Sequence, residues 1–305
     1  MSAKEAEVHF KGILANVDSS ILQMNFGHGF KIESFSEEEA VAFFSRLEKI
    51  PRGTVVRRYF FQYQCLNNPE RRMYVVSNLL RNALNRSSVE VFNKIQGFDA
   101  TIIEHHLEPT IRLMRLFKEG DIRMPVKFYY RIQREEIKEM TTIESGRNVS
   151  HWPFHLEVSE IPVLRSFIKS VELPFKKDFL QLAFENFELS HEVADTQLAF
   201  LVLMIGIETL LNPSEYEIGH RVSRNMAVLL GKNKKNSEEI FAQGKKLYGK
   251  RSTIVHSGKR KIIEKEDLFE LRNYLREAIK KMHCMGKGKS EIMALLDSHG
   301  FGQEI

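Results

Sequence analysis

The C-terminal half of the chain repeats apolar residues at intervals of three and four positions, the period of a helix with one buried face. This pattern predicts helices over residues 174–191, 196–211, 218–230, 236–257, 266–285 and 290–298. Within the second of them, the segment Leu198 to Leu211 is apolar nearly all round and carries Glu208 as its one charged residue. Such a helix is typical of the centre of a bundle. We therefore expect a helical bundle here, and core positions in its first helix at Phe175, Phe179, Leu182, Phe187 and Leu189.

The N-terminal half mixes patterns of strands and helices. Strands are expected over residues 9–15, 29–34, 54–65, 73–76 and 126–132, with a turn at Asn67-Asn68-Pro69 that would make the third and fourth a hairpin. Ser36 and Glu39 have the form of a capping box and open a helix that continues to residue 49. Residues 102–118 read as a second helix, which Pro109 should break or kink. The sequence thus predicts an α+β domain of unknown role over residues 1–172, then an all-α domain over residues 173–300.

The helix expected to begin near residue 236 contains a cation at an apolar position. Asn236 is a good N-cap, Glu239 completes a capping-box pattern, and Gly258 ends the helix with His256 in its last turn. Apolar or small residues recur along one face at positions 240, 241, 244, 247, 248, 254 and 255. The same series requires a residue at position 251, and the chain supplies an arginine there. A guanidinium stays charged, so Arg251 must find an anion or line a cleft.

The preceding apolar helix offers Arg251 a partner. Glu208 is the single charge of that helix, so a pair between Glu208 and Arg251 is a specific structural prediction. Such a pair could also be purely architectural, because buried ion pairs often specify packing without taking part in chemistry.

Three blocks on these helices resemble the HEPN superfamily, and in particular its Apea-like branch. The blocks are Ile207-Glu208-Thr209-Leu210-Leu211-Asn212-Pro213, then Arg221-Val222-Ser223-Arg224-Asn225-Met226-Ala227-Val228-Leu229-Leu230-Gly231, then Leu247-Tyr248-Gly249-Lys250-Arg251-Ser252-Thr253-Ile254-Val255-His256-Ser257-Gly258. The last block contains the R-x(4–6)-H signature of that superfamily as Arg251 and His256. The resemblance covers about residues 175–285 and leaves the N-terminal half unexplained. It implies a HEPN-like helical bundle in which two copies pair and their motif helices form one shared cleft.

The chemistry of the two motif residues suits cleavage of RNA without a metal ion. His256 can exchange a proton near neutral pH, and Arg251 can stabilise the charge on a pentacoordinate phosphorus. The two positions lie about 140° apart on a regular helix, so we adopt the pairing that the resemblance implies, a C2 homodimer with two Arg251 and two His256 at one phosphate. Ser252, where many members of the superfamily carry Asn, Asp or His, would bind the phosphate or orient the imidazole. His256 could instead serve only to cap the carbonyls of its helix.

Composition agrees with an RNA-binding protein without demanding one. The chain of 305 residues has a net charge of +5 and a pI of about 9.0, which permits a polyanionic partner. Candidate phosphate contacts surround the predicted helix ends: Arg221, Arg224, Lys259, Arg260 and Lys261. No stretch is long enough for a membrane span, and the start lacks the apolar core of a signal peptide. Cys65 and Cys284 have no metal-ligand spacing, and we expect a reducing cytoplasm, no metal and no cofactor.

Three features of the N-terminal half suggest other sites. His105-His106 could touch a metal, but adjacent helical residues point in different directions. His151-Trp152-Pro153-Phe154-His155 could form a ligand loop, or a buried Trp–Phe anchor between domains. Arg57-Arg58 with the aromatic residues that follow could stack nucleic acid, or form a strand with one buried aromatic face.

Three functions remain open at this stage. The first is a metal-independent endoribonuclease, a toxin-like or antiviral effector whose N-terminal domain senses a trigger or restrains the activity. An antitoxin or a trigger ligand is a possible partner of such a protein. The second is a non-catalytic RNA-binding or scaffolding HEPN protein, in which Arg251 and Glu208 are structural. The third is the HEPN partner of a nucleotidyltransferase toxin–antitoxin pair, in which a tyrosine stands two residues after the histidine. Gly258 occupies that position here, which removes most of the support for the third function.

Overall fold

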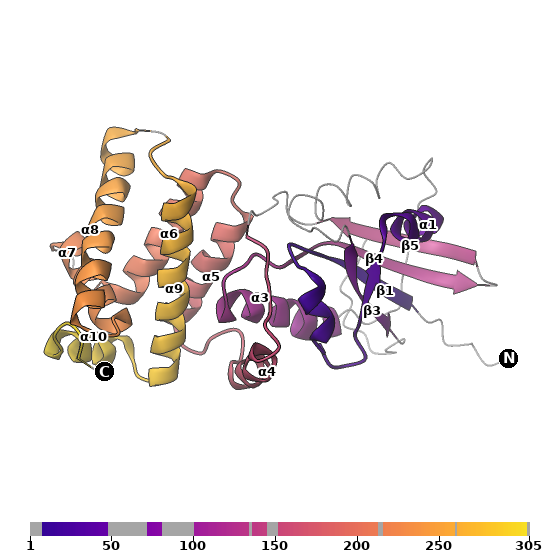
Figure 1. The fold of residues 1–305 in the computed structure, drawn as a ribbon, viewed down its shortest axis with the longest axis horizontal. Coiled ribbons are helices and arrows are strands. Elements are labelled where there is room, and N and C mark those ends of the chain that lie inside the picture. Colours follow the sequence, from indigo (N-terminus) through magenta and orange to yellow (C-terminus); the bar gives the residue numbers. More distant parts are fainter. Residues whose placement is uncertain are drawn as a thin grey trace. The chain divides into compact units, whose positions relative to one another are not determined.

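The computed structural model describes residues 8–47, 72–80, 101–133, 136–144, 152–212, 216–259 and 261–303. The chain divides into two compact units, Met1–Val171 and Glu172–Ile305, and the division lies within one residue of the predicted boundary. The first unit is a sheet with helices and the second is all helical (Figure 1). The coarse expectation of an α+β domain followed by a helical one is confirmed. No helix among the described residues is both long and apolar enough to cross a membrane.

The first unit is built on a five-stranded antiparallel sheet. Its strands lie in the order β2-β3-β1-β4-β5, so the first strand of the chain is central. Each neighbouring pair is antiparallel, and β1 is hydrogen-bonded to β3 on one side and to β4 on the other. The strands are β1 Val8–Ala15, β2 Lys31–Phe35, β3 Met73–Leu80, β4 Arg123–Gln133 and β5 Glu136–Glu144.

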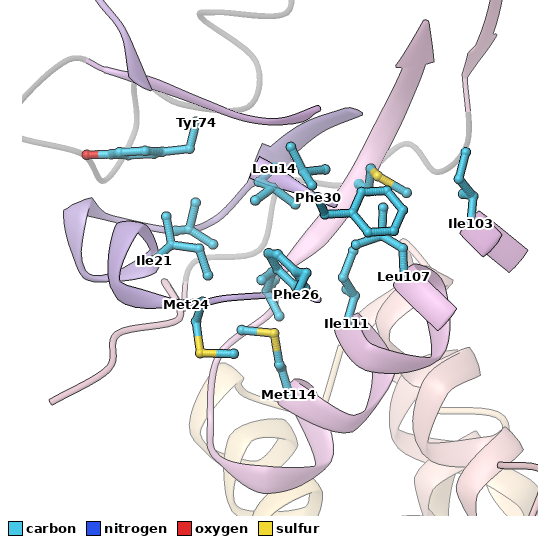
Figure 2. Packing of buried hydrophobic residues seen from close by; sticks show 14 of the residues in the cluster. Leu14, Ile21, Met24, Phe26, Phe30, Tyr74, Ile103, Leu107, Ile111 and Met114 are labelled. Atoms are coloured by element: carbon cyan, nitrogen blue, oxygen red, sulfur yellow. The ribbon is translucent and has the colours of Figure 1, made fainter. Parts of the chain in front are cut away.

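Alternate residues of β1 enter two separate cores. Phe10 and Leu14 lie in the larger core with side chains of η1 (Ser19–Gln23), α4 (Glu160–Ser170) and the two consecutive helical segments η2 (Ile103–Leu107) and α3 (Glu108–Phe117). Figure 2 shows Ile21, Leu107 and Met114 converging with Leu14 in that core. Ile13 lies in the smaller core with Ala40 of α1 (Glu37–Leu47). The period-2 pattern of β1 thus places helices on both faces of the sheet.

Most of the described N-terminal predictions are confirmed. The capping box is present, because the Ser36 N–H donates to Glu39 Oε2 at 2.7 Å and the Glu39 N–H donates to Ser36 Oγ at 3.2 Å. Pro109 lies in the second position of α3, directly after the π-helical η2, so the helix changes its period just before the proline instead of ending there. Residues 54–65, the first strand of the predicted hairpin, lie outside the described residues, as do Arg57-Arg58. The described β3 is paired with β1 and β2.

The second unit is a bundle of long helices with a short one at its end. The helices are α5 Asp178–Glu192, α6 Thr196–Leu211, α7 Ile218–Leu230, α8 Lys234–Ser257, α9 Lys265–Met285 and α10 Lys289–Ser298. Helix α6 packs mainly on α5 and α9, and α8 packs mainly on α7. Glycines allow close approach: a Cβ at Gly206 would lie 2.7 Å from Leu275 Cδ2 of α9, and a Cβ at Gly244 would lie 2.7 Å from Met226 Cε of α7.

The predicted start of α8 was wrong. The helix begins at Lys234, with Asn233 as the N-cap, and the Asn233 side chain accepts a hydrogen bond from the Asn236 N–H at 2.9 Å. Asn236 lies inside the first turn, and its side chain accepts from the Lys232 N–H at 3.1 Å. Two asparagines three residues apart both have the form of a cap, and the sequence alone did not separate them. The predicted end is confirmed, since Gly258 is left-handed at φ 63°.

Two predictions about burial in the bundle were also wrong. Helix α5 begins at Asp178, four residues after Pro174, and its Leu182 and Leu189 are about half exposed instead of forming core. Helix α6 is not buried all round, because Leu198 is 56% exposed and Ile205 is 49% exposed. Both helices therefore present apolar side chains outward that no described part of the chain covers.

Candidate functional site

The last turn of α6 and the C-terminal part of α8 bring Glu208 and Arg251 together. Arg251 Nε lies 3.2 Å from Glu208 Oε1, and the two side chains are 26% and 19% exposed. The pair thus lies at the edge of the bundle and not at its centre. Arg251 falls on the buried stripe of α8 with Leu247 and Ile254, so the helical period aims its guanidinium at α6.

Tyr248 completes the surroundings of Arg251. Its ring lies one turn before Arg251 on α8, and the guanidinium carbon is 5.6 Å from the ring centroid, within cation–π range. Gly219 of α7 also packs against this ring, where a Cβ would lie 2.5 Å from Tyr248 Cδ1. Burial and the nearby Glu208 raise the pKa of Tyr248. Sequence reasoning placed Tyr248 only on the apolar stripe, although its position three residues before Arg251 could have indicated the contact.

The carboxylate of Glu208 has few favourable contacts in the folded protein. Burial raises the pKa of Glu208 above its ordinary value, and the positive charge of Arg251 offsets only part of that effect. Glu208 Oε1 is buried and accepts no hydrogen bond from the described residues, so its contact with Arg251 is an ion pair of imperfect geometry. In an ion pair that serves only to stabilise the fold, both carboxylate oxygens of Glu208 would be expected to accept hydrogen bonds.

Most donors of Arg251 are unused within the described chain. Its contacts there are the ion pair through Nε and the Tyr248 ring, and the terminal NH₂ groups donate no hydrogen bond to a described residue. About a quarter of the side chain reaches solvent. A guanidinium held at its Nε end, with its fork open, is suited to bidentate binding of a phosphate.

His256 lies in the last turn of α8 and is exposed. The end of the helix is satisfied without it: the Gly258 N–H donates to Ile254 O at 3.1 Å and Ser257 Oγ donates to Thr253 O at 2.5 Å. His256 makes no hydrogen bond or ion pair with any described residue, which counts against a purely capping role. It does not approach Arg251 in the same chain, because the two positions point about 140° apart on the helix. Ser252 is half-buried and lies between them in direction, about 100° from Arg251.

Helix α6 runs antiparallel along the last turns of α8. Besides the contact of Glu208 with Arg251, Gln197 at the start of α6 holds the loop that follows α8. Gln197 Nε2 donates to Lys259 O at 3.3 Å, and the Lys261 N–H donates to Gln197 Oε1 at 2.9 Å. These contacts place α6 along the last two turns of α8, the part of that helix that carries Arg251 and His256.

Helices α5, α6 and α8 each expose aliphatic side chains, which we refer to together as the apolar face. Asn186 of α5 lies against Gly206 of α6, with its Cβ 3.4 Å from the position of a Cβ at 206, which places the outward sides of the two helices next to each other. The residues of this apolar face are each about half exposed: Leu182, Leu189, Leu198, Ile205 and Val255. Exposed aliphatic side chains on neighbouring helices are typical of interaction surfaces.

The predicted phosphate contacts are in four different situations. Arg224 donates to the carbonyl oxygens of Leu296 at 3.0 Å and His299 at 2.9 Å, and so binds the C-terminal end of α10. Arg221 of α7 has a buried Nε that donates to no described residue. Lys259 and Lys261 are exposed beside the end of α8. Arg260 lies outside the described residues. The contacts of Arg224 favour a structural role for it.

The candidate sites of the first unit are accounted for by packing. Phe154 is fully buried in the larger core of that unit, and its N–H donates to Asn16 O at 2.7 Å, so this residue anchors its loop there. His155 contacts Asp18 at 2.7 Å and Glu157 at 3.1 Å, and His151 lies outside the described residues. His106 contacts Phe26 O through Nε2 at 2.5 Å. Among the described residues, no three His, Cys, Asp or Glu side chains are grouped so that they could hold a metal ion.

Comparisons with known proteins add no relative to this description. No protein-family model matches the chain, and neither a curated protein nor a solved structure matches it. The resemblance to the HEPN superfamily therefore depends on the three sequence blocks on α6, α7 and α8. The geometry of Glu208, Arg251 and His256 is the basis on which a function can be argued.

Proposed function

We propose that this protein is a metal-independent endoribonuclease of the HEPN type. The observation that carries the proposal is the open guanidinium of Arg251, fixed by Glu208 and Tyr248 on a helix whose last turn carries an exposed imidazole. One group is a permanent cation with unused donors. The other is an imidazole, the side chain that most often acts as a general acid or base. Together they supply the two functions that transfer of an RNA phosphate to its own 2′-oxygen requires.

In the proposed reaction His256 acts as the general base or the general acid. A base removes the proton of the 2′-hydroxyl, the 2′-oxygen attacks the adjacent phosphorus, and the bond from phosphorus to the 5′-oxygen breaks. An acid then protonates the leaving 5′-oxygen, and a cyclic 2′,3′-phosphate remains on the upstream fragment. Arg251 binds the non-bridging oxygens, whose negative charge grows in the transition state. Ser252 lies in direction between the two residues and would hydrogen-bond the same phosphate.

A homodimer would bring these groups together. Within one chain Arg251 and His256 point about 140° apart, so a cleft that uses both needs a second copy. In this proposal a C2 pair would cover the apolar face of Leu182, Leu189, Leu198, Ile205 and Val255, and Val255 directly precedes His256. A pair formed through this face would place two copies of the last turn of α8 close to each other.

The alternative is a non-catalytic HEPN protein that binds RNA or acts as a scaffold. The separation of Arg251 and His256 within one chain is the observation that favours it, since a phosphate bound at Arg251 would not reach His256 of the same copy. In this alternative Glu208 and Arg251 stabilise the contact of α6 with α8, and RNA is bound but not cut.

Cleavage in the presence of EDTA separates the two functions. We expect purified protein to cut a mixed single-stranded RNA with EDTA present and to leave cyclic phosphate ends, which phosphatase does not remove until acid opens the ring. Arg251→Ala and His256→Ala should both abolish the products, while Lys246→Ala, an exposed α8 position, should cut like the wild type. Far-UV circular dichroism would check that each variant is folded.

Two results would contradict the catalytic function. Equal cleavage by wild type and both variants would assign the activity to a contaminant, and loss of cleavage with EDTA would assign it to a metal-dependent enzyme. RNA binding by the wild type without cleavage at any protein concentration would support the scaffolding alternative. A toxin-like or antiviral role, with a trigger ligand at the N-terminal unit or an antitoxin partner, remains part of the proposal and calls for growth assays in cells.

A further inference from the structure

Two lysine-rich segments lie at the end of the bundle away from Arg251. Residues 231–237 join α7 to α8, and residues 280–290 hold the end of α9 and the start of α10. The ends of α7 and α9 meet there, because Lys281 Nζ donates to Leu229 O at 2.9 Å. Both segments contribute lysines to one depression of the surface. We refer to the seven lysines of the two segments together as the basic end: Lys232, Lys234, Lys235, Lys280, Lys281, Lys287 and Lys289.

The positive charge of the chain is concentrated at the basic end. Neither segment contains an aspartate or a glutamate, so the seven lysines contribute +7 there. The net charge of the chain is +5, so all other residues together carry −2. Lys280 is paired with Glu277 at 2.6 Å. Five of the other lysines form no side-chain hydrogen bond or ion pair with a described residue: Lys232, Lys234, Lys235, Lys287 and Lys289. Such a cluster of charges attracts anions.

Two lysines of the basic end lie where a helix disfavours positive charge. Lys234 and Lys235 are the first two residues of α8, and the first turn of that helix contains no acidic residue. The start of a helix carries the positive end of its dipole and backbone N–H groups that lack a helical partner. The two lysines therefore lower the stability of α8 and add to the positive potential at its start. A bound anion would offset both effects.

The composition of the basic end favours a row of phosphates as the partner. The two segments contain no Phe, Tyr or Trp, so they offer none of these rings for a base to stack on. None of the large apolar side chains that the described residues expose lies in either segment, whereas a helix bound at a membrane surface buries an apolar face. Lysine binds a phosphate as a point charge on a flexible stem. Contacts of this kind hold a nucleic-acid backbone without reading its sequence.

We propose that the basic end binds the backbone of the same RNA strand that reaches Arg251. Arg251 lies seventeen residues after Lys234 on α8, which is about 26 Å along the helix axis. At about 3.4 Å per stacked nucleotide, a strand that contacts both places has at least about eight nucleotides. The basic end thus holds RNA outside the cut and favours long substrates over short ones. The identity of the strand rests on the proposed function, whereas binding at the basic end can be measured without cleavage.

An RNA that cannot be cut measures this binding. The probe is a single-stranded RNA with 2′-O-methyl groups, which lacks the attacking hydroxyl and, at about 30 nucleotides, is long enough to span both places. Fluorescence anisotropy gives its affinity for the full-length protein at several salt concentrations. The basic-end variant neutralises three exposed lysines through Lys232→Gln, Lys235→Gln and Lys287→Gln. Each lost contact lowers the slope of log K against log salt by about 0.7, so the slope should fall by about 2 and the affinity about 100-fold at about 0.1 M salt.

A matched variant makes the same change of charge elsewhere. Lys31→Gln, Lys169→Gln and Lys246→Gln alter three exposed lysines that do not belong to the basic end. This variant should keep the slope and the affinity of the wild type. In cleavage of unmodified RNA, the basic-end variant should cut the long RNA more slowly than the wild type does. It should cut a tetranucleotide, which is too short to span both places, at the wild-type rate.

The outcomes separate RNA binding at the basic end from the proposed nuclease activity. If the wild type cuts RNA and the basic-end variant binds and cuts the long RNA equally well, the basic end is not an RNA surface and the nuclease stands. If binding needs these lysines but the wild type cuts no RNA, the surface stands and the nuclease does not. An equal loss of affinity in the matched variant would overturn the assignment to the basic end. So would loss of binding to phosphatidylserine vesicles with RNA binding retained, which would indicate a membrane surface. Absence of RNA binding by the wild type would overturn both.

Discussion

Two arginines of the bundle show how a charged side chain can be used in opposite ways. Arg224 on α7 donates to the carbonyl oxygens of Leu296 and His299 and approaches the carboxylate of Asp297 at 3.9 Å. Arg251 on α8 has one ion pair and one aromatic contact, and its terminal NH₂ groups donate to no described residue. Both side chains are roughly a quarter to a third exposed, so burial does not distinguish them.

What distinguishes the two arginines is how many donors the fold already uses. A guanidinium has five N–H donors. In an arginine with a purely structural role, most of these donors are hydrogen-bonded to acceptors within the protein. Arg224 follows that rule at the end of α10, where helix carbonyls lack partners of their own. Arg251 does not follow it. The same contrast appears between two histidines, since both ring nitrogens of His155 contact carboxylates, whereas His256 contacts no described residue.

The largest expected effect separates the two arginines by activity and stability. Arg251→Ala should lower the rate of RNA cleavage about 10²–10³-fold, the loss typical of a group that stabilises charge in the transition state, and should change Tm little. Arg224→Ala should lower the free energy of unfolding by about 1–3 kcal/mol, because it leaves carbonyls unpaired, with cleavage per folded molecule unchanged. Cleavage rates and thermal unfolding of both variants test this. If the two variants lost cleavage rate and stability to a similar extent, the proposed difference between a catalytic and a structural arginine would be contradicted.

The next prediction tests whether the open groups work across two copies. Arg251→Ala and His256→Ala should each be inactive alone, and mixing them after subunit exchange should restore part of the activity, because the mixed dimer retains one intact arginine and one intact histidine. Ile205→Asp, on the apolar face, should dissociate the dimer and abolish cleavage, since it places a charge where aliphatic side chains would pack. Sedimentation velocity and cleavage assays measure both effects. Full activity of monomeric Ile205→Asp would contradict the composite site.

A smaller effect is expected from the carboxylate that holds Arg251. Burial raises the pKa of Glu208 in the folded protein, so its stabilising contribution is present below the unfolded pKa, near 4.3, and is lost as pH rises through the folded value. Wild type should therefore gain stability relative to Glu208→Gln as pH falls from neutral towards 4. The change should stay under about 1 kcal/mol, because the pair is partly exposed. Urea unfolding at several pH values measures it, and a difference that shrinks on acidification would show the opposite sign.

The smallest effect belongs to the histidine whose partners are fixed. A hydrogen bond to Asp18 raises the pKa of His155; burial acts to raise the pKa of Asp18, but hydrogen bonds from Ser20 and His155 lower it on balance. The contribution of protonated His155 to the free energy of unfolding is lost as pH rises through its raised pKa. The contribution of ionised Asp18 to that free energy is lost as pH falls through its lowered pKa. His155→Ala should cost under about 1 kcal/mol, most visibly at about pH 4 to 6.5. A similar loss in His256→Ala would weaken the comparison.

The sequence predicted the elements of the bundle better than the surfaces they present. The bounds of α7 were predicted to the residue, because polar and apolar positions change sharply at Ile218 and Leu230. The outward apolar residues of α5 and α6 were assigned to the core, since hydropathy alone does not show which side of a helix has a partner. Strand β5 and helix α4 were not predicted, although apolar residues of α4 recur at the helical period at Ile161, Leu164 and Ile168.

The candidate site was only partly predictable, for a related reason. The contact of Glu208 with Arg251 follows from two charges on two otherwise apolar stripes, and both were visible in the sequence. The contact of the Tyr248 ring with Gly219 joins α8 to α7. Which residue of α7 faces Tyr248 depends on how the two helices pack, and the periodicity of the sequence does not show this. The hydrogen bond from the Gly302 N–H to Ser237 Oγ of α8 joins residues 65 positions apart, and no periodic pattern in the sequence indicates it.

The absence of a side chain at Gly219 of α7 determines where the Tyr248 ring of α8 can lie. An alanine there would displace the Tyr248 ring, which has no flexible end with which to yield. The aromatic surface under the guanidinium of Arg251 would then tilt, and the direction of its open fork would change with it. A methyl group on α7 would thus redirect the side chain of Arg251 on α8, for which we propose phosphate binding, without altering Arg251 itself.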